Sequence, residues 1–333
     1  MTAEEFIRKY ADENKIDNIG ICSADNFEEI RKDLEKNAEV LKGFAERDIE
    51  KRINVRLTME NAQSIICIAQ GFNTKYEIKR DGEIRSYISM GAIGEDYHIY
   101  IKRMLEGLSE KMKEKFGGEY MCFSDTGPLS DRAVAVRSGI GYRGKNGCVI
   151  AKKGGAAVFI GYIITSLKLK ADSEGRESCG ECKRCILSCP SGALSENGFE
   201  AEKCISYLTQ IKRELTLEEM ETIGYNLYGC DVCQRVCAKT EKAENVCTDI
   251  DKCMPKTEEI LNLSQKEFKE KYGKTAMGWR GAAVIKRNAL CSLMKYKNQK
   301  AYEIAVKAAK SESPTVKKAA EKAAEFIVDS MGE

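Results

Sequence analysis

Cysteine is concentrated in one part of this 333-residue sequence: ten of its 15 cysteines lie between Cys179 and Cys253. Four of them form the pattern Cys-x-x-Cys-x-x-Cys-x-x-x-Cys-Pro, which ends at Pro190. In bacterial proteins with this spacing, three thiolates bind one iron–sulfur cubane and the fourth binds a second cluster. The fold of this segment is therefore expected to depend on bound metal.

A second group of cysteines completes the ligands of two clusters. Cys230, Cys233 and Cys237 repeat the close spacing, and Cys204 brings the total to eight. The crossed pattern assigns Cys179, Cys182, Cys185 and Cys237 to cluster one and Cys189, Cys204, Cys230 and Cys233 to cluster two. Two zinc sites are the main alternative, but zinc chemistry does not require the tripled spacing or the trailing proline. Two clusters imply the relay of single electrons to an acceptor.

The remaining cysteines are predicted to have other environments. Five are scattered through apolar surroundings, where a free thiol usually serves as a small core residue. These five are Cys22, Cys67, Cys122, Cys148 and Cys291. Cys247 and Cys253 are left without an assignment.

The composition is that of a folded globular protein. Hydrophobic residues make up 43% of the sequence and only 4 residues are proline, which excludes a disordered linker. The 54 Lys and Arg nearly balance the 52 Asp and Glu, for a net charge of +2, which excludes a protein that coats nucleic acid by bulk charge.

No membrane partner or export signal is predicted. The longest uncharged apolar stretch, Gly154 to Leu167, is shorter than the roughly 20 residues that a membrane-spanning helix needs. Met1 to Glu5 lack the basic and apolar pattern of a signal peptide, so the chain is expected in the cytoplasm. That compartment is reducing and disfavours a disulfide scaffold.

Residues 1–168 are predicted to form one mixed α/β domain. A capping box at Thr2 and Glu5 opens a helix. Short Ile-rich strands at 19–23 and 64–69 flank a charged stretch, 26–52, that is typical of helix. Further on, the sequence predicts a long amphipathic helix from residue 97, a strand at 119–124, a helix at 130–138, a glycine-rich turn, and two strands separated by residues 152–155.

Two more domains are expected after a polar boundary at 170–178. Residues 169–254 are predicted to be a bacterial-ferredoxin-like domain with two 4Fe-4S clusters. Residues 255–333 are rich in Lys, Ala and Glu, with apolar residues at helical spacing. They are predicted to form a small α-helical, HEAT-like module.

Asp125 is the candidate catalytic residue. It follows the strand at 119–124 and precedes Thr126-Gly127-Pro128, a turn at the carboxyl end of a strand, where α/β proteins commonly bind ligands. A carboxyl group there can act as an acid, although an Asp in this position often only caps a turn. The single histidine, His98, is followed by Ile-Tyr-Ile and lacks the Asp-x-His-x-x-Gly pattern that supplies a lower ligand to cobalamin.

The sequence as a whole resembles the epoxyqueuosine reductases (QueG), cobalamin-dependent iron–sulfur enzymes of the last step of queuosine synthesis in tRNA. The eight cysteines carry the resemblance together with ordered motifs along most of the chain. These motifs are Ile19-Gly20-Ile21, Tyr87 to His98, Asp125 to Pro128 with Asp131-Arg132-Ala133, Gly144-Lys145-Asn146, Cys204 to Gln210, Lys274 to Met277 and Arg287-Asn288-Ala289.

The resemblance implies a chemistry and a set of contacts. Cob(I)alamin, reduced through the clusters, would attack the substrate while Asp125 donates the proton that lets the epoxide oxygen leave as water. The corrin is expected to be base-off, with no histidine ligand. Its side-chain contacts would come from Lys145, Asn146, Ser206 and Gln210. An electron donor of flavodoxin or ferredoxin type and a monomeric state are also expected.

A basic stretch near the C-terminus fits an RNA partner. Residues 271–300 hold eight Lys or Arg and no Asp or Glu. Clustered cations contact phosphates, and Trp279 and Tyr272 are available to stack on bases. The residues predicted to contact tRNA are Lys274, Arg280, Lys286 and Arg287.

Two other functions are weighed against the tRNA enzyme. A corrinoid reductase of a small molecule, akin to reductive dehalogenases, would share the clusters but would not need the basic stretch. A two-cluster electron-transfer protein would need neither cobalamin nor Asp125.

Overall fold

The computed structural model describes residues 1–40, 43–75, 81–175, 177–240 and 247–332. The chain forms two compact units. Unit 1 comprises Met1–Phe72, His98–Leu187 and Cys233–Glu241, and unit 2 comprises Asn73–Tyr97, Ser188–Val232 and Lys242–Glu333. Each unit therefore combines three separate segments, whereas the sequence predicts three consecutive domains. That three-domain division stays a prediction.

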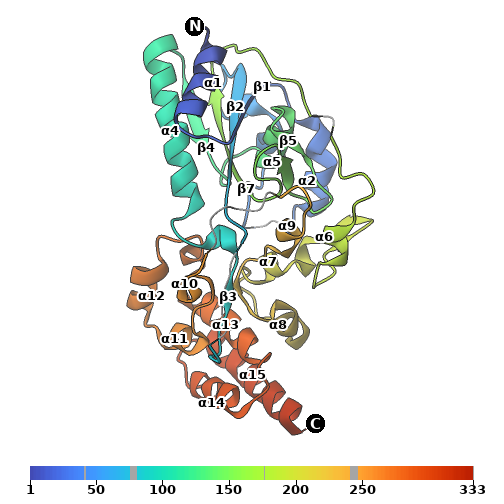
Figure 1. The fold of residues 1–333 in the computed structure, drawn as a ribbon, viewed down its shortest axis with the longest axis vertical. Coiled ribbons are helices and arrows are strands. Elements are labelled where there is room, and N and C mark those ends of the chain that lie inside the picture. The colour runs from blue at the N-terminus through green and yellow to red at the C-terminus, as the bar shows by residue number, and fades with distance from the viewer. Residues whose placement is uncertain (41–42, 76–80, 176, 241–246, 333) are drawn as a thin grey trace. The chain divides into compact units, whose positions relative to one another are not determined.

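Unit 1 is built on a four-stranded sheet with the order β1-β2-β7-β4 (Figure 1). The strands are β1 (Asn18–Ser23), β2 (Ser64–Gly71), β4 (Tyr120–Phe123) and β7 (Val158–Thr165). Every neighbouring pair is antiparallel. The predicted strands are present, so the mixed α/β class is confirmed, and the sheet itself is antiparallel.

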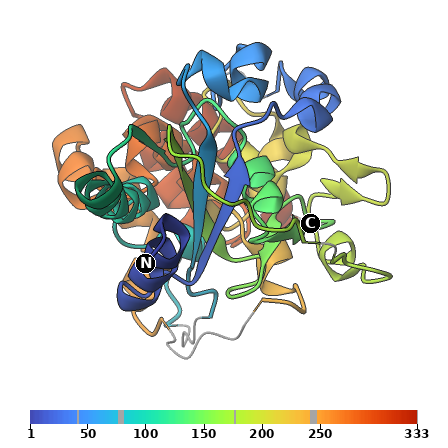
Figure 2. The ribbon, with the colours of Figure 1, turned by 90° about the horizontal axis from the view of Figure 1, so that it is seen from above.

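The two faces of this sheet are covered by different helices (Figure 2). The first face packs against α1 (Ala3–Glu13) and α4 (Tyr97–Phe116), and the second against α5 (Asp131–Arg137). Because side chains alternate along a strand, Ile163 of β7 enters the first core and its neighbours Tyr162 and Ile164 enter the second.

The helices on the first face follow the sequence pattern. Glu5 N donates to Thr2 Oγ1 over 3.2 Å, and Thr2 N donates to Glu5 Oε2 over 2.9 Å, which confirms the capping box. Helix α4 buries Ile101, Leu105, Leu108 and Met112. Gly161 of β7 allows this close approach, because a Cβ atom there would lie 2.4 Å from Ile101 Cγ2.

The charged stretch at 26–52 is less regular than predicted. It contains a short 3-10 turn (Glu28–Ile30), α2 (Arg31–Asn37) and α3 (Ile49–Ile53), while residues 41–42 lie outside the described part of the chain. A new helix begins at α3 because the Asp48 side chain accepts hydrogen bonds from the backbone N–H groups of Glu50 and Lys51.

Unit 1 also contains a hairpin of β5 (Gly141–Arg143) and β6 (Val149–Ala151). The glycine-rich sequence predicted only a turn at β5. Two short helices, α6 (Arg184–Leu187) and α9 (Val232–Arg235), lie within the cysteine-rich segment.

Unit 2 is mainly helical. Strands β3 (Tyr87–Ile88) and β10 (Asn226–Tyr228) pair in parallel. At the C-terminus, α13 (Ala282–Leu293) and α14 (Gln299–Ala308) both pack against α15 (Pro314–Gly332). The predicted helical module is therefore present, and its HEAT-like character stays a prediction. The other elements are α7 (Ile205–Leu208), α8 (Leu217–Ile223), α10 (Ile250–Cys253), α11 (Thr257–Asn262), α12 (Gln265–Tyr272), β8 (Leu194–Ser195) and β9 (Gly198–Phe199).

Within the described residues, none of the helices has the length and apolar character needed to cross a membrane.

Candidate functional site

Asp125 occupies a tight turn directly after β4. Its backbone φ is +56°, a left-handed conformation that is uncommon for residues other than glycine and that Asp tolerates better than most. The next glycine is required by packing, because a Cβ atom on Gly127 would lie 2.3 Å from the Tyr162 hydroxyl oxygen. The Asp125 side chain is 56% exposed, and its Oδ2 lies 3.2 Å from His98 Nε2. No sequence pattern predicts that His98 lies beside Asp125.

A second carboxyl group lies against the same turn. Asp131 is the first residue of α5, and its Oδ2 accepts a hydrogen bond of 2.8 Å from Asp125 N. Burial, and then the charge of Asp125, raise the pKa of Asp131 to about 7, while Arg132 and Arg52 act in the opposite direction. The turn thus contains one exposed carboxyl group and one with a strongly raised pKa.

The cysteines predicted to bind cluster one all belong to unit 1. Cys179 and Cys237 pack against the same small apolar cluster, formed by Tyr142, Ile150 and Ala156. The pKa of Cys185 is raised, first by burial and also by the charges of Cys179 and Cys182. The chain therefore brings Cys237 back to the first cysteine of the motif, as the crossed pattern requires.

Three of the four cysteines predicted for cluster two belong to unit 2. Burial raises the pKa of Cys230 to about 11, and the charges of Cys204 and Cys189 add to the effect. These three thiols are thus close enough to interact electrostatically. The fourth residue, Cys233, belongs to unit 1. Among the described residues, no group of three or more His, Cys, Asp or Glu is arranged to hold a single metal ion.

The glycine-rich turn of unit 1 holds the backbone of the cysteine segments. Lys145 Nζ donates to the carbonyl oxygen of Gly180 over 2.7 Å, and Asn146 Nδ2 donates to that of Cys233 over 3.4 Å. Both residues were predicted to contact a corrin. In the structure, their side chains bind the polypeptide next to two predicted cluster ligands, and the corrin contact stays a prediction.

Cys148 is a residue whose surroundings sequence reasoning missed. Its Sγ accepts a hydrogen bond of 3.9 Å from Gln234 Nε2. A hydrogen bond with Cys233 lowers the pKa of the Cys148 thiol to about 7, against the effect of burial. Cys148 is therefore not simply a core residue, although nothing in its local sequence signals the contact.

Ser206 and Gln210 lie together in unit 2. Gln210 Nε2 donates to the carbonyl oxygen of Ser206 over 3.0 Å. Gln210 Oε1 accepts from the Tyr228 hydroxyl over 3.1 Å, and that hydroxyl accepts from Trp279 Nε1 over 2.8 Å. A chain of hydrogen bonds therefore links the two predicted corrin contacts to Trp279.

Arg287 does not have the environment of an RNA contact, and this prediction is wrong. The residue is 1% exposed. Its guanidinium group donates to the carbonyl oxygens of Leu208, Ile211 and Arg213 over 2.7 to 3.1 Å. Desolvation lowers its pKa to about 10. Arg287 therefore anchors the segment after Ser206 to α13 and has no surface for a phosphate.

The structure also corrects the predictions that Lys286 contacts tRNA and that Tyr272 stacks on a base. Lys286 Nζ donates to the carbonyl oxygen of Leu263, and Tyr272 is only 7% exposed, so its ring is not available for stacking. Lys271 and Lys300 form ion pairs with Glu259 and Glu83.

Lys274, Trp279 and Arg280 retain a placement suited to a ligand. Lys274 is exposed, and Trp279 is 53% exposed. The Arg280 guanidinium group stacks on the Trp279 ring, 3.4 Å from its centroid. Trp279 thus offers an aromatic surface beside the positive charge of Arg280, whose Nε and Nη2 atoms are buried.

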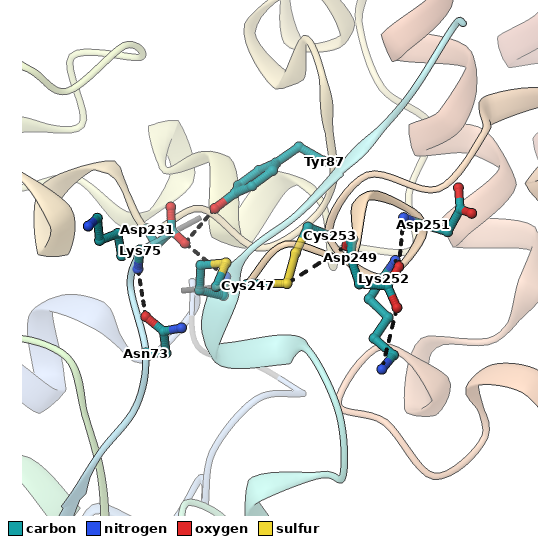
Figure 3. The surroundings of a disulfide bond; sticks show 10 residues. Asn73, Lys75, Tyr87, Asp231, Cys247, Asp249, Asp251, Lys252 and Cys253 are labelled. Carbon is teal, nitrogen blue, oxygen red and sulfur yellow. Dashed lines mark hydrogen bonds and ion pairs between the residues drawn. A yellow bond between two sulfur atoms is a disulfide. The ribbon is translucent and has the colours of Figure 1, made fainter. Parts of the chain in front are cut away.

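The two unassigned cysteines form a disulfide in unit 2 (Figure 3). Cys253 is fully buried at the end of α10. Cys247 N donates to the carbonyl oxygen of Lys75 over 3.1 Å. The pair lies outside the eight predicted cluster ligands.

Comparison with known proteins identifies the class and then the family. Residues 178–240 match the family model "4Fe-4S double cluster binding domain", so the chain is a protein with two 4Fe-4S clusters. Residues 52–126 match the model "Epoxyqueuosine reductase QueG, DUF1730". An epoxyqueuosine reductase of Bacillus anthracis is 38% identical over 298 residues, which cover 86% of this chain and 78% of that protein. The chain belongs to the epoxyqueuosine reductase family and is an oxidoreductase.

Two solved structures are similar over nearly the whole chain. One is an epoxyqueuosine reductase with an epoxyqueuosine-modified stem loop of tyrosine tRNA, with a TM-score of 0.91, 34% identity, and coverage of 97% of this chain and 90% of that one. The other is epoxyqueuosine reductase from Bacillus subtilis with its catalytic aspartate loop swung out of the active site. Its TM-score is 0.88 at 31% identity, with coverage of 99% of this chain and 98% of that one.

Proposed function

We propose that this chain reduces epoxyqueuosine in tRNA to queuosine. The observation that carries the proposal is the similarity, over 97% of the chain, to a reductase structure that contains an epoxyqueuosine-modified tRNA stem loop. No observation favours the small-molecule reductase or the simple electron carrier over this function.

The reaction requires two electrons and two protons, because the epoxide becomes an alkene and its oxygen leaves as water. Two 4Fe-4S clusters pass electrons one at a time, from a donor of flavodoxin or ferredoxin type. Asp125 is the proton donor that this chain supplies. His98 Nε2 lies 3.2 Å from Asp125 Oδ2, and this contact orients the acid.

Cobalamin, when bound, supplies a strongly reducing metal centre for the two-electron step. Ser206 and Gln210 are proposed as contacts of the corrin amide side chains, which need donors and acceptors; the Gln210 amide also bonds to Ser206 and Tyr228 within unit 2. Lys145 and Asn146 are proposed as further corrin contacts, and their side chains also bond to the backbone of Gly180 and Cys233. We propose a base-off corrin without a histidine ligand, since the single histidine contacts Asp125.

The eight cysteines predicted from the spacing are our proposed cluster ligands. Lys274 and Arg280 are the proposed phosphate contacts, and Trp279 is the proposed base-stacking surface on a HEAT-like module. We further propose a monomeric protein of the cytoplasm, organised as the three domains 1–168, 169–254 and 255–333.

The function is tested with the anaerobic, reconstituted protein. Given cobalamin, a strong reductant and tRNA that carries epoxyqueuosine, it is expected to form queuosine, measured by mass spectrometry of the tRNA nucleosides. A halogenated aromatic compound is the control substrate for the small-molecule alternative. Absence of queuosine with both clusters intact would refute the proposal.

Replacing Trp279 with Ala is expected to weaken tRNA binding by about 1–3 kcal/mol, because stacking of a base on an exposed aromatic ring contributes about that much.

Neutralising Lys274 and Arg280 together is expected to reduce the slope of log affinity against log salt concentration, since fewer counterions are released. Both effects are measured by fluorescence anisotropy with a labelled anticodon stem loop.

The matched control is Lys266→Ala, an exposed lysine on α12 outside the basic stretch. Its affinity and salt dependence are expected to equal those of the wild type. Equal tRNA affinity of the Trp279 variant and the wild type would show that Trp279 does not contact the RNA. It would not contradict the proposed reaction.

A further inference from the structure

The turn that carries Asp125 has a conformation that needs support. The backbone of Asp125 is left-handed, and Thr126 N donates to the carbonyl oxygen of Ser124 over 2.6 Å. The Asp125 side chain is largely exposed. The contact with His98 involves the Asp125 side chain, whereas the left-handed backbone is held by a group that bonds to the Asp125 N–H.

That group is Asp131, six residues further along the chain. Its Oδ2 accepts the backbone N–H of Asp125, although Asp131 opens α5, where acidic side chains commonly serve their own helix. Ser130, the N-cap residue, makes no side-chain capping hydrogen bond. The carboxyl group of Asp131 is thus directed to the turn.

The other oxygen of this carboxyl group is buried and has no hydrogen-bond partner among the residues that the structure describes. Burying a carboxyl oxygen without a hydrogen-bond partner costs free energy, so such a group in a folded protein calls for an explanation. Arg52 and Arg132 provide the opposing positive charge without a direct ion pair to this oxygen. Within the described residues, the bond from Asp125 N is therefore the one hydrogen bond that the Asp131 carboxyl group accepts.

We infer that Asp131 is a positioning residue whose carboxylate holds the Asp125 turn in the conformation that presents the Asp125 carboxyl group to His98. This inference rests on the proposed function for its catalytic meaning. In the Bacillus subtilis relative, the catalytic aspartate loop is seen swung out of the active site. In this chain, breaking the bond from Asp131 would release the turn.

The hold on the turn is expected to depend on pH. An ionised carboxylate is a stronger acceptor than a neutral carboxyl group, and the pKa of Asp131 is about 7. The hold is therefore stronger above this value and weaker below it. The charged or titratable groups that face Asp131 are Asp125, Arg132, Arg52, Tyr162 and Cys67.

The experiment measures hydrogen exchange of the Asp125 amide in the reconstituted full-length protein without substrate, corrected for the intrinsic exchange rate. In the wild type, protection is expected to rise roughly ten-fold from about pH 6 to about pH 8. Asp131→Ala is expected to lose roughly ten-fold of the protection at the higher pH. Asp131→Asn keeps an acceptor that cannot ionise, so its protection is expected to be independent of pH.

Ser130→Ala is the matched control, because it changes the neighbouring residue without removing a capping bond. It is expected to behave as the wild type. In turnover, Asp131→Ala is expected to lower kcat roughly ten-fold with an unchanged KM for tRNA. Unchanged protection and an unchanged pH profile in Asp131→Ala would overturn the inference. The exchange measurement needs no reaction, so this failure is distinct from failure of the proposed function.

Discussion

Replacing Asp125 with Asn is expected to lower the single-turnover rate of queuosine formation by about 10²- to 10⁴-fold, the usual contribution of a positioned general acid. The amide has nearly the shape of the carboxyl group but has no acidic proton to donate to the epoxide oxygen. The measurement is a rapid-quench time course with pre-reduced protein and modified tRNA. The absorption spectrum of the clusters is expected to be that of the wild type, because no predicted ligand is altered.

The control for this variant is Asp12→Asn, an exposed carboxylate near the end of α1. It removes the same charge and is expected to leave the rate unchanged. A full rate in Asp125→Asn would show that the proton comes from another group. A rate that is low only because tRNA binds weakly would show instead that Asp125 acts in binding, and a titration of tRNA concentration separates these outcomes.

The second large effect is expected from Cys185→Ser, which removes a buried thiol of the first cysteine motif. A hydroxyl group is a poor substitute for a thiolate at an iron–sulfur cluster, so iron content is expected to fall from about eight to about four atoms per chain. Turnover is expected to fall below detection, because electrons no longer reach the acceptor. Iron and sulfide analysis, with electron paramagnetic resonance of the reduced protein, measures the loss.

Cys122→Ser is the matched control for that variant. Cys122 is a half-buried thiol on β4 that lies 3.6 Å from the Ser109 hydroxyl group and belongs to neither predicted set. It is expected to retain both clusters and the full iron content. Retention of eight irons by Cys185→Ser would contradict the ligand assignment, and a wild-type protein that carries zinc without sulfide would contradict the clusters altogether.

Features encoded by short-range patterns could be predicted from the sequence. The spacing of the cysteines identified a protein with two clusters, because three of the four proposed ligands of the first cubane lie within a few residues of one another. The capping box at Thr2 and Glu5, and the apolar positions of α4, gave helices that the structure confirms. These patterns act within one turn or one helix face, so the local sequence contains them completely.

Features that depend on distant partners could not be predicted in this way. Arg287 stands in a run of positive charge, yet its partners are carbonyl oxygens of residues 208–213. Backbone carbonyl groups are uncharged, so a count of charged side chains does not reveal them as partners. His98 meets Asp125 only because α4 packs beside the sheet. The contact between Cys148 and Cys233 likewise depends on how the β5–β6 hairpin meets the cysteine segment.

The pairing of β3 with β10 has a consequence for how the protein is made. Tyr87 leaves the ribosome long before its partner Asn226 has been synthesised, and unit 1 likewise waits for Cys233–Glu241. Domains usually fold one after another as the chain emerges, but here neither unit is complete until most of the polypeptide exists. The proposed ligands of both clusters are therefore complete only once Cys237 has been synthesised.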